Sequence, residues 1–220
     1  MRLILFVFML SISTYLVAQD TNINQPQADN WDGRWSVSVL FGGNSASNSK
    51  AIKEINSKVP TPVSDVNNDN FIDNLSAGFE LSYYYSRNWS TSFSGVNIDG
   101  FSTERLCFLF CEDRDDLDTS MTDINKYSIT QNYAHPLWNN GFITLKAGVT
   151  LTTYDIQQSV YSEEFSSFQE IYSSNESKWG GVVGVKLSHL FFDSMAMSIG
   201  FDKFTTFNSS VTYLQIGYVY

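Results

Sequence analysis

The segment "DVNNDNFID" carries side chains whose types and spacing could bind a divalent cation. Four oxygen-bearing residues occupy positions 1, 3, 5 and 9 of a twelve-residue calcium-binding loop: Asp65, Asn67, Asp69 and Asp73. Asn70 stands where glycine is usual, and Ser76 stands where a bidentate glutamate would complete the ligands. The segment therefore predicts either a weak Ca²⁺ site or an Asn/Asp-rich loop held by its own side chains. No other cofactor is expected.

Two further residue types could do chemistry. Cys107 and Cys111 lie in "CFLFC", and in an exported protein this spacing predicts a small disulfide, which requires a tight turn. The two histidines, His135 and His189, fall at short turns on the periplasmic side without an acid–base constellation around them. No catalytic residue is predicted, and the protein is expected not to be an enzyme.

Apolar and polar residues alternate with a period of two along most of the chain. Successive strand residues point to opposite sides of a sheet, so each alternating segment predicts a strand with one apolar and one polar face. We count eight such segments: 34–41, 74–85, 88–93, 126–133, 142–153, 178–189, 194–202 and 211–220. The predicted fold class is all-β, with eight antiparallel strands in an up-and-down barrel.

The polar face places charged side chains inside this barrel. The predicted interior ion-pair network consists of Glu80, Lys126, Lys146, Lys186 and Asp202. Side chains fill a barrel of eight strands, and buried charges must pair, so no open pore is expected.

The apolar face indicates where the barrel lies. Small polar residues fit inside the narrow barrel, whereas the apolar face would expose a continuous belt if it met water. Facing lipid is favourable, and aromatic residues near the strand ends then form interfacial girdles: Trp35, Tyr85, Trp89, Tyr133, Trp179 and Tyr220. The sequence therefore predicts a transmembrane β-barrel rather than a soluble barrel around a greasy ligand.

The connections between predicted strands alternate between long and short. The long stretches, about 44–73, 100–123 and 155–177, all fall at one end of the barrel and are expected to be loops. This asymmetry is typical of outer-membrane barrels, with long loops outside the cell and short periplasmic turns.

The beginning of the chain predicts export. Arg2 precedes a short apolar run and a small residue, Ala18, which indicates a signal peptide at 1–18. Residues 19–33 would form an N-terminal periplasmic segment, and residues 34–220 the barrel. The formal charge of −10 argues against nucleic acid as a partner, because phosphates would be repelled.

With these features the sequence resembles the small eight-stranded outer-membrane barrels of the OmpA transmembrane domain, OmpX and OmpW type. The resemblance covers residues 34–220 and implies the outer membrane of a Gram-negative bacterium, with extracellular loops. It also implies that the barrel-assembly machinery recognises the last strand through Leu214, Ile216, Tyr218 and Tyr220. Outer-membrane lipid and lipopolysaccharide are the other expected partners.

The expected function is non-enzymatic and carried by the extracellular loops. Surface interaction or adhesion through an extracellular ligand and envelope stability both fit the sequence. The alternative is narrow transport of small hydrophobic molecules. A charged plug in the interior favours the first group, and an apolar cavity that opens sideways favours transport.

Overall fold

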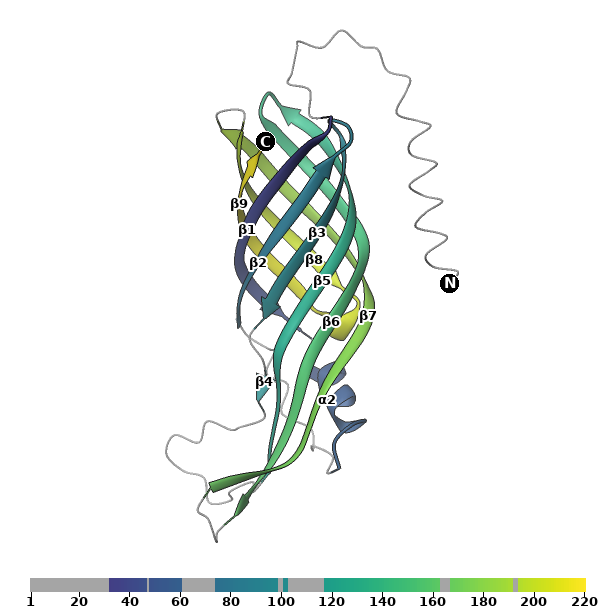
Figure 1. Cartoon of the computed structure of the whole chain (residues 1–220), viewed down its shortest axis with the longest axis vertical. Coiled ribbons are helices and arrows are strands. Elements are labelled where there is room, and N and C mark those ends of the chain that lie inside the picture. The colour runs from purple at the N-terminus through teal and green to yellow at the C-terminus, as the bar shows by residue number, and fades with distance from the viewer. Residues whose placement is uncertain are drawn as a thin grey trace, which may run out of the picture. The chain divides into compact units, whose positions relative to one another are not determined.

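Eight antiparallel strands form a closed ring in the protein (Figure 1). The computed structural model describes residues 32–46, 48–60, 74–98, 101–102, 117–162, 167–191 and 194–220, all within one compact unit, Trp31–Tyr220. The strands of the ring are β1 (Arg34–Ser45), β2 (Asn74–Tyr84), β3 (Trp89–Ile98), β5 (Leu117–Trp138), β6 (Gly141–Ser162), β7 (Ser167–Phe191), β8 (Met195–Phe204) and β9 (Ser210–Val219). The predicted fold class is confirmed.

Two strand pairings complete the ring. The first strand, β1, pairs with the last, β9, from Ser36↔Val219 to Ser45↔Ser210. β3 pairs directly with β5, although the two-residue strand β4 (Phe101–Ser102) lies between them in the sequence. Closure of this kind satisfies backbone donors and acceptors that an open sheet would leave at its edges. The first and last predicted strands are therefore neighbours.

The two ends of the barrel differ in their connections. Residues 85–88 and 139–140 join strands at one end, which also carries Tyr220, and we call it the short-turn end (Figure 1). The connections between β1 and β2, β3 and β5, and β6 and β7 lie at the opposite, long-loop end. This arrangement agrees with the asymmetry expected from the sequence.

The outer wall of the barrel is apolar and exposed. Every strand of the ring contributes large hydrophobic side chains to it, and Leu75 and Trp179 are 78% and 72% exposed. The residues between them along each strand face inward, and many are buried serines and threonines such as Ser38, Ser92 and Thr130. An exposed apolar surface around a polar interior is the reverse of a water-soluble domain, and lipid contact stabilises it.

Three strands continue beyond the ring at the long-loop end. β8 follows β7 only to Val182↔Phe204, and β3 follows β5 only to Ile98↔Ile124, whereas β5, β6 and β7 remain paired past these points (Figure 1). We call this three-stranded extension the projecting sheet. A β-bulge at Asp123, with φ 51°, marks the place where β5 leaves the ring.

The projecting sheet corrects two sequence expectations. Residues 155–177 were expected to be loop, but strands occupy them as far as Ser162 and again from Ser167. Residues 100–123 were also expected to be loop, but β5 begins at Leu117. The projecting sheet lies beyond the lipid, so neither of its faces needs a continuous row of apolar side chains. Residues 155–177 therefore lack the apolar–polar alternation on which the strand prediction depends.

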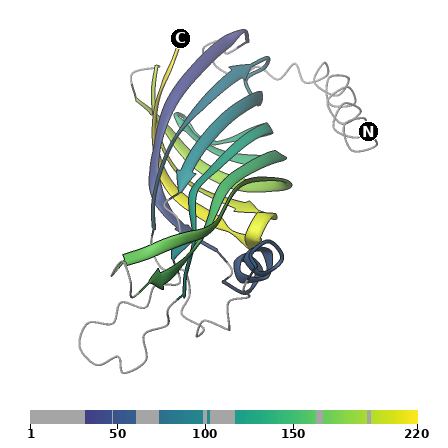
Figure 2. The same cartoon turned by 60° about the horizontal axis from the view of Figure 1, so that its bottom comes forward.

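A short helix, α2 (Asn48–Asn56), lies beside the single-turn η1 (Thr206–Asn208) at the long-loop end (Figure 2). Its buried residues Ala51, Ile52 and Ile55 form one apolar face. The sequence analysis treated this stretch as loop. Among the residues that the structure describes, no helix is long and apolar enough to cross a membrane.

Candidate functional site

The centre of the barrel holds a network of four buried charges. Lys146 Nζ lies 2.9 Å from Glu80 Oε2 and 2.9 Å from Asp202 Oδ2, and Lys186 Nζ lies 2.8 Å from Glu80 Oε1. The side chains of Glu80 and Lys146 are each 1% exposed. Two cations thus face two anions, and each charge that leaves water has an opposite partner within hydrogen-bond distance.

Two neutral side chains from β9 complete this network. Gln215 donates from Nε2 to Glu80 Oε1 at 3.0 Å, and the Tyr213 hydroxyl lies 3.3 Å from both Lys146 Nζ and Asp202 Oδ1. The sequence analysis did not single out Tyr213. Its inward position, two residues before Gln215 on the same face of β9, was the signal that could have identified it.

Lys126 does not belong to the network, which corrects the predicted set of five. It faces inward and is 1% exposed, as expected, but its ammonium has no hydrogen-bond partner among the described side chains. The Nζ atom instead lies 4.7 Å from the ring centroid of Phe204 and 5.9 Å from that of Phe207. Cation–π contacts therefore surround this amine in place of carboxylates.

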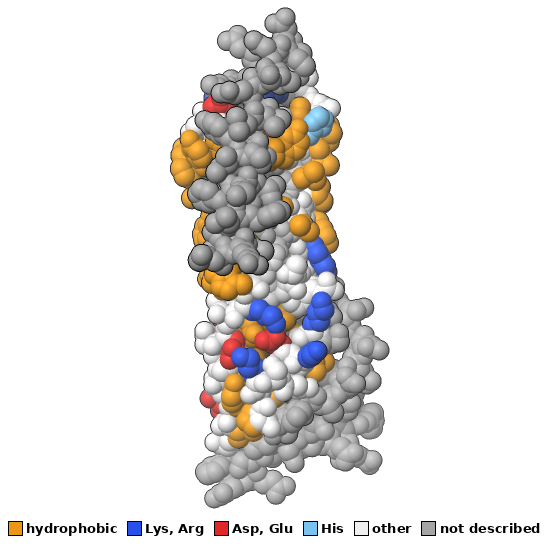
Figure 3. Space-filling model, turned by 90° about the vertical axis from the view of Figure 1, so that its right-hand side faces the viewer, with side chains coloured by type: hydrophobic (Ala, Val, Ile, Leu, Met, Phe, Trp, Pro, Cys, Tyr) orange, Lys and Arg blue, Asp and Glu red, His pale blue; other side chains and the backbone are white. Residues whose placement is uncertain are grey.

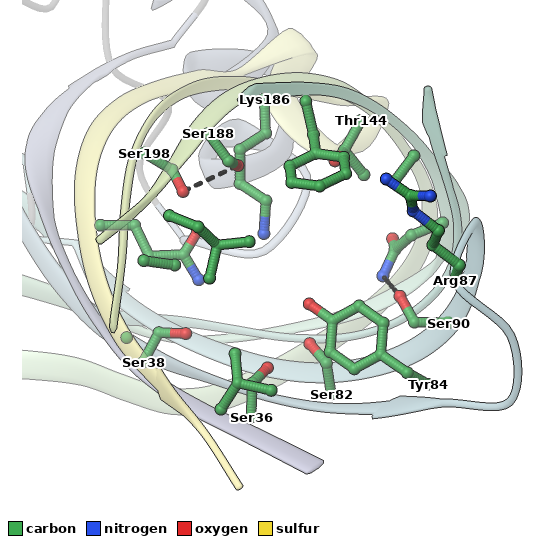
Figure 4. Close-up of a pocket in the computed structure, with 18 residues that line it drawn as sticks. Ser36, Ser38, Ser82, Tyr84, Arg87, Ser90, Thr144, Lys186, Ser188 and Ser198 are labelled. Atoms are coloured by element: carbon green, nitrogen blue, oxygen red, sulfur yellow. Dashed lines mark hydrogen bonds between the residues drawn. The ribbon is translucent and has the colours of Figure 1, made fainter. Parts of the chain in front are cut away.

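A small cavity lies on the short-turn side of the network. It has a volume of about 50 Å³, and its lining mixes serine and threonine hydroxyls, Arg87 and Lys186 with apolar side chains such as Phe142 and Leu190 (Figure 4). The hydroxyls also bond to one another, as in the 2.8 Å hydrogen bond from Ser198 to Ser188. A space of this size holds a few water molecules and no larger solute.

An apolar cluster fills the interior on the other side of the network, at the long-loop end. It joins inward residues of the strands with α2 and η1: Leu40, Ile55, Val59, Val96, Ile98, Met121, Ile124, Tyr154, Ile156, Val182, Phe204, Phe207, Val211 and Tyr213. Tyr154 and Phe207 meet edge to face, with their ring centroids 5.1 Å apart. The described interior is therefore closed by charged side chains at its centre and by apolar side chains at this end.

Ion pairs fasten α2 to the inner side of the projecting sheet. Lys58, just after the helix, lies 2.9 Å from Glu176 of β7, Lys178 pairs with Glu54, and the Tyr154 hydroxyl donates to Glu54 at 3.0 Å. Partial burial alone would raise the pKa of Glu54, but the hydrogen bonds from Lys178 and Tyr154 and the nearby positive charges outweigh it. The pKa of Glu54 is thus lowered from its usual 4.5. The hydrogen bond and charge of Glu176 raise the pKa of Lys58.

Several predicted sites fall outside the described residues. These are the candidate calcium ligands Asp65, Asn67, Asp69 and Asp73 and the candidate disulfide Cys107–Cys111. In the remainder of the chain, no group of three His, Cys, Asp or Glu side chains could hold a metal ion. The four residues of the expected assembly signal all face outward and are exposed, and their role stays a prediction: Leu214, Ile216, Tyr218 and Tyr220.

The histidines lie at the short-turn end. His189 Nδ1 accepts a 3.2 Å hydrogen bond from Trp138 Nε1 and packs edge to face against Phe191, and both histidines lie near the turn at 139–140. An imidazole held by two aromatic neighbours on the outer wall acts as part of the aromatic girdle.

Comparison with known proteins bears on the fold. Neither a protein-family model nor a curated protein matches the sequence. Ail, the attachment invasion locus protein of Yersinia pestis, has a similar solved structure, with a TM-score of 0.50, 11% identity, and coverage of 86% of this chain and 99% of Ail. The outer membrane protein OprG from Pseudomonas aeruginosa also matches with a TM-score of 0.50, at 10% identity over 89% of this chain and 99% of OprG.

At these identities the likeness is one of fold. Together with the exposed apolar wall and polar interior, it defines the class of fold: the chain has the fold of a small eight-stranded outer-membrane β-barrel.

Proposed function

We propose that this protein is a closed, non-enzymatic anchor that presents the projecting sheet and α2 at the cell surface for interaction with an extracellular ligand. The observation that carries the proposal is the filled interior, where the charged network and the apolar cluster follow one another along the barrel. A barrel closed in this way has its accessible polar surface at its ends.

The projecting sheet supports surface interaction over a purely mechanical role. β6 and β7 stay paired to Ser162↔Ser167, far past the last pairing of β7 with β8, so the extension has its own backbone hydrogen bonds. A rigid surface binds at a lower entropic cost than a loop that must be ordered. Ail, which has this fold, carries attachment in its name.

The same interior disfavours transport of small hydrophobic molecules. Such transport would need an apolar cavity reaching sideways through the wall, and the cavity beside the charged network has a volume of only about 50 Å³, with serine hydroxyls, Arg87 and Lys186 in its lining. β7 and β8 also remain paired from Phe191↔Met195 to Val182↔Phe204, which keeps that part of the wall closed.

We further propose that the long-loop end faces outward and the short-turn end faces the periplasm. Long connections on the outer side and short ones on the inner side are the rule for outer-membrane barrels. An epitope inserted between Ser162 and Ser167 should be accessible to antibody on intact cells, whereas one at 139–140 should need permeabilised cells.

The decisive experiment shortens the projecting sheet. In the trimmed variant an Asn-Gly turn replaces residues 158–172, so that Gln157 and Ser173, which are register partners, remain opposed. In the matched control the same turn replaces residues 163–166, which leaves the sheet at full length. Non-adherent Gram-negative cells carrying each form are tested for binding to matrix proteins, glycans and neighbouring cells.

Wild type and control should bind above the empty-vector background, and the trimmed variant should lose at least about tenfold while still inserting into the outer membrane. Undiminished binding by the trimmed variant, or none by wild type, would reject the proposal. Faster uptake of small hydrophobic solutes into vesicles containing the barrel would instead establish the transport alternative.

A further inference from the structure

The lysines of this protein divide into two groups. Three of the eight, Lys126, Lys146 and Lys186, face into the barrel interior. The other five lie on or beside α2, on the adjoining part of β7, and at the end of β8: Lys50, Lys53, Lys58, Lys178 and Lys203. All the lysines outside the interior thus gather near one place in a chain whose formal charge is −10.

Two of these five ammonium groups form ion pairs with described carboxylates, Lys58 with Glu176 and Lys178 with Glu54. The other three, Lys50, Lys53 and Lys203, are cationic groups outside these two pairs. Figure 3 shows Lys and Arg side chains, with Asp and Glu side chains among them, just beyond the hydrophobic surface on one face of the barrel. Cationic side chains just beyond the apolar belt lie at the level of the lipid headgroups of the leaflet at the long-loop end.

A groove in the outer wall begins beside this cluster. It has a volume of about 260 Å³ and a mostly apolar lining from β6, β7, β8 and the turn before η1. Small side chains shape it, because Ala147, Gly181 and Thr205 lie where neighbouring outward positions carry Leu145, Trp179 and other large residues. The groove is therefore a gap between the large side chains of the apolar belt.

Lys203 joins the groove to the charged cluster. It is the outward residue that follows Phe201 on β8, it pairs with exposed Val183, and it lines the groove. Its ammonium donates to Asn208 O at 2.8 Å, and an ammonium group has two further donors. A cation at the lipid-facing edge of an apolar groove is costly unless an anion accompanies it there.

We propose that this groove is a binding site for one phosphate-bearing lipid of the outer leaflet. An acyl chain lies along Ala147, Gly181 and Val183, and the phosphate bonds to Lys203 with support from the neighbouring lysines. The groove accounts for the apolar part of the ligand, and Lys203 with the lysines near it accounts for the anionic part. The inference depends on membrane insertion and not on the proposed surface interaction.

The glycine in the groove offers a clean way to fill it. A Cβ atom on Gly181 would meet its nearest neighbour, Thr205 Cγ2, at 3.6 Å, so the backbone tolerates a side chain that then occupies the groove. Gly43 is the matched control, because it lies in β1 toward the same end of the barrel and a Cβ there has no neighbour within 4 Å. Arg34→Gln is the control for charge, since it removes a cation at the short-turn end.

The test measures binding of bisphosphorylated lipid A to the purified barrel in neutral detergent by native mass spectrometry. Wild type should bind one molecule and should bind the dephosphorylated lipid at least about tenfold more weakly. Lys203→Gln and Gly181→Leu should each weaken binding by roughly five- to tenfold, whereas Gly43→Leu and Arg34→Gln should leave it unchanged.

Equal binding by all five proteins would overturn the proposal, because lipid would then coat the wall without a site. Displacement by inorganic phosphate alone, together with normal binding by Gly181→Leu, would also overturn it, since the groove would have no part. The assay contains no cells, so its failure and loss of surface interaction in the trimmed variant are separate results.

Discussion

At the scale of single residues, the charged network dominates the energetics of the interior. Glu80 accepts from both lysines and from Gln215, so its carboxylate is satisfied on both oxygens. Removing one partner from a buried ion pair leaves an uncompensated charge, which costs more than the pair itself contributes.

Lys146→Met should therefore destabilise the barrel strongly. The change leaves Asp202 without its described ion-pair partner, and we expect the free energy of unfolding to fall by about 3–5 kcal/mol. Equilibrium urea unfolding in phospholipid vesicles measures this loss. Lys53→Met, which removes an exposed ammonium on α2, is the control and should change the value by less than about 0.5 kcal/mol. A loss below about 1 kcal/mol for Lys146→Met would show that the network contributes little.

Alternation along strands was enough to predict which charges point inward, but not which of them meet. Lys126 is the register partner of Thr152, whereas Lys146 lies six residues earlier on β6, a separation of about 20 Å along the sheet. The position of each charge along the barrel depends on the register between strands, and the two-residue alternation does not specify that register. The pairing of Lys146 with both acids, and the exclusion of Lys126, therefore required the structure.

At the scale of elements, α2 is held by few interactions and should be the first part to detach. Its attachment combines the burial of Ile52 and Ile55 with the pairs Glu54–Lys178 and Lys58–Glu176. The helix escaped prediction because its nine residues supply one short apolar face. The strands inside the membrane were predictable, since lipid requires a long apolar row on each of them.

Docking of α2 should weaken in acid. Because the pKa of Glu54 in the folded state is below its unfolded value of 4.5, its contribution is complete above 4.5 and is lost as the pH falls through the lowered pKa. The raised pKa of Lys58 acts in the opposite direction, so its contribution is complete below 10.5 and is lost at higher pH.

Hydrogen exchange of the α2 amides, corrected for intrinsic rates, measures this dependence. Between pH 7 and pH 3.5 the protection should decrease by about three- to tenfold in wild type. Glu54→Gln should show the reduced protection already at pH 7 and little further change on acidification. If Glu54→Gln kept full protection at pH 7, the carboxylate would have no role in holding the helix.

At the scale of the whole molecule, the apolar wall and the closed ring define a transmembrane barrel, which we expect to resist unfolding in detergent. The ring joins β1 to β9 and β3 to β5, so no strand within it presents an unpaired edge along the membrane-spanning part. The alternating pattern and the loop asymmetry predicted this architecture. The projecting sheet was missed because its faces meet water.

Unboiled and boiled samples should migrate differently on a denaturing gel. The closed barrel excludes detergent from its interior, so the unboiled form should remain compact and run faster than the boiled one. Identical migration would contradict a closed ring. In the same assay, Lys146→Met should convert to the slow form at a lower temperature than wild type, which links the gel to the measured loss of stability.

The distances along the chain within the charged network have a kinetic consequence. Glu80 meets Lys146 across 66 residues, Lys186 across 106 and Gln215 across 135. Contacts between distant parts of a chain form late and slowly, so hairpins that enter lipid one at a time would carry unpaired charges until β9 arrived. We therefore expect a concerted route, in which the strands curl toward one another while the interior still has access to water and the ring closes as the final step.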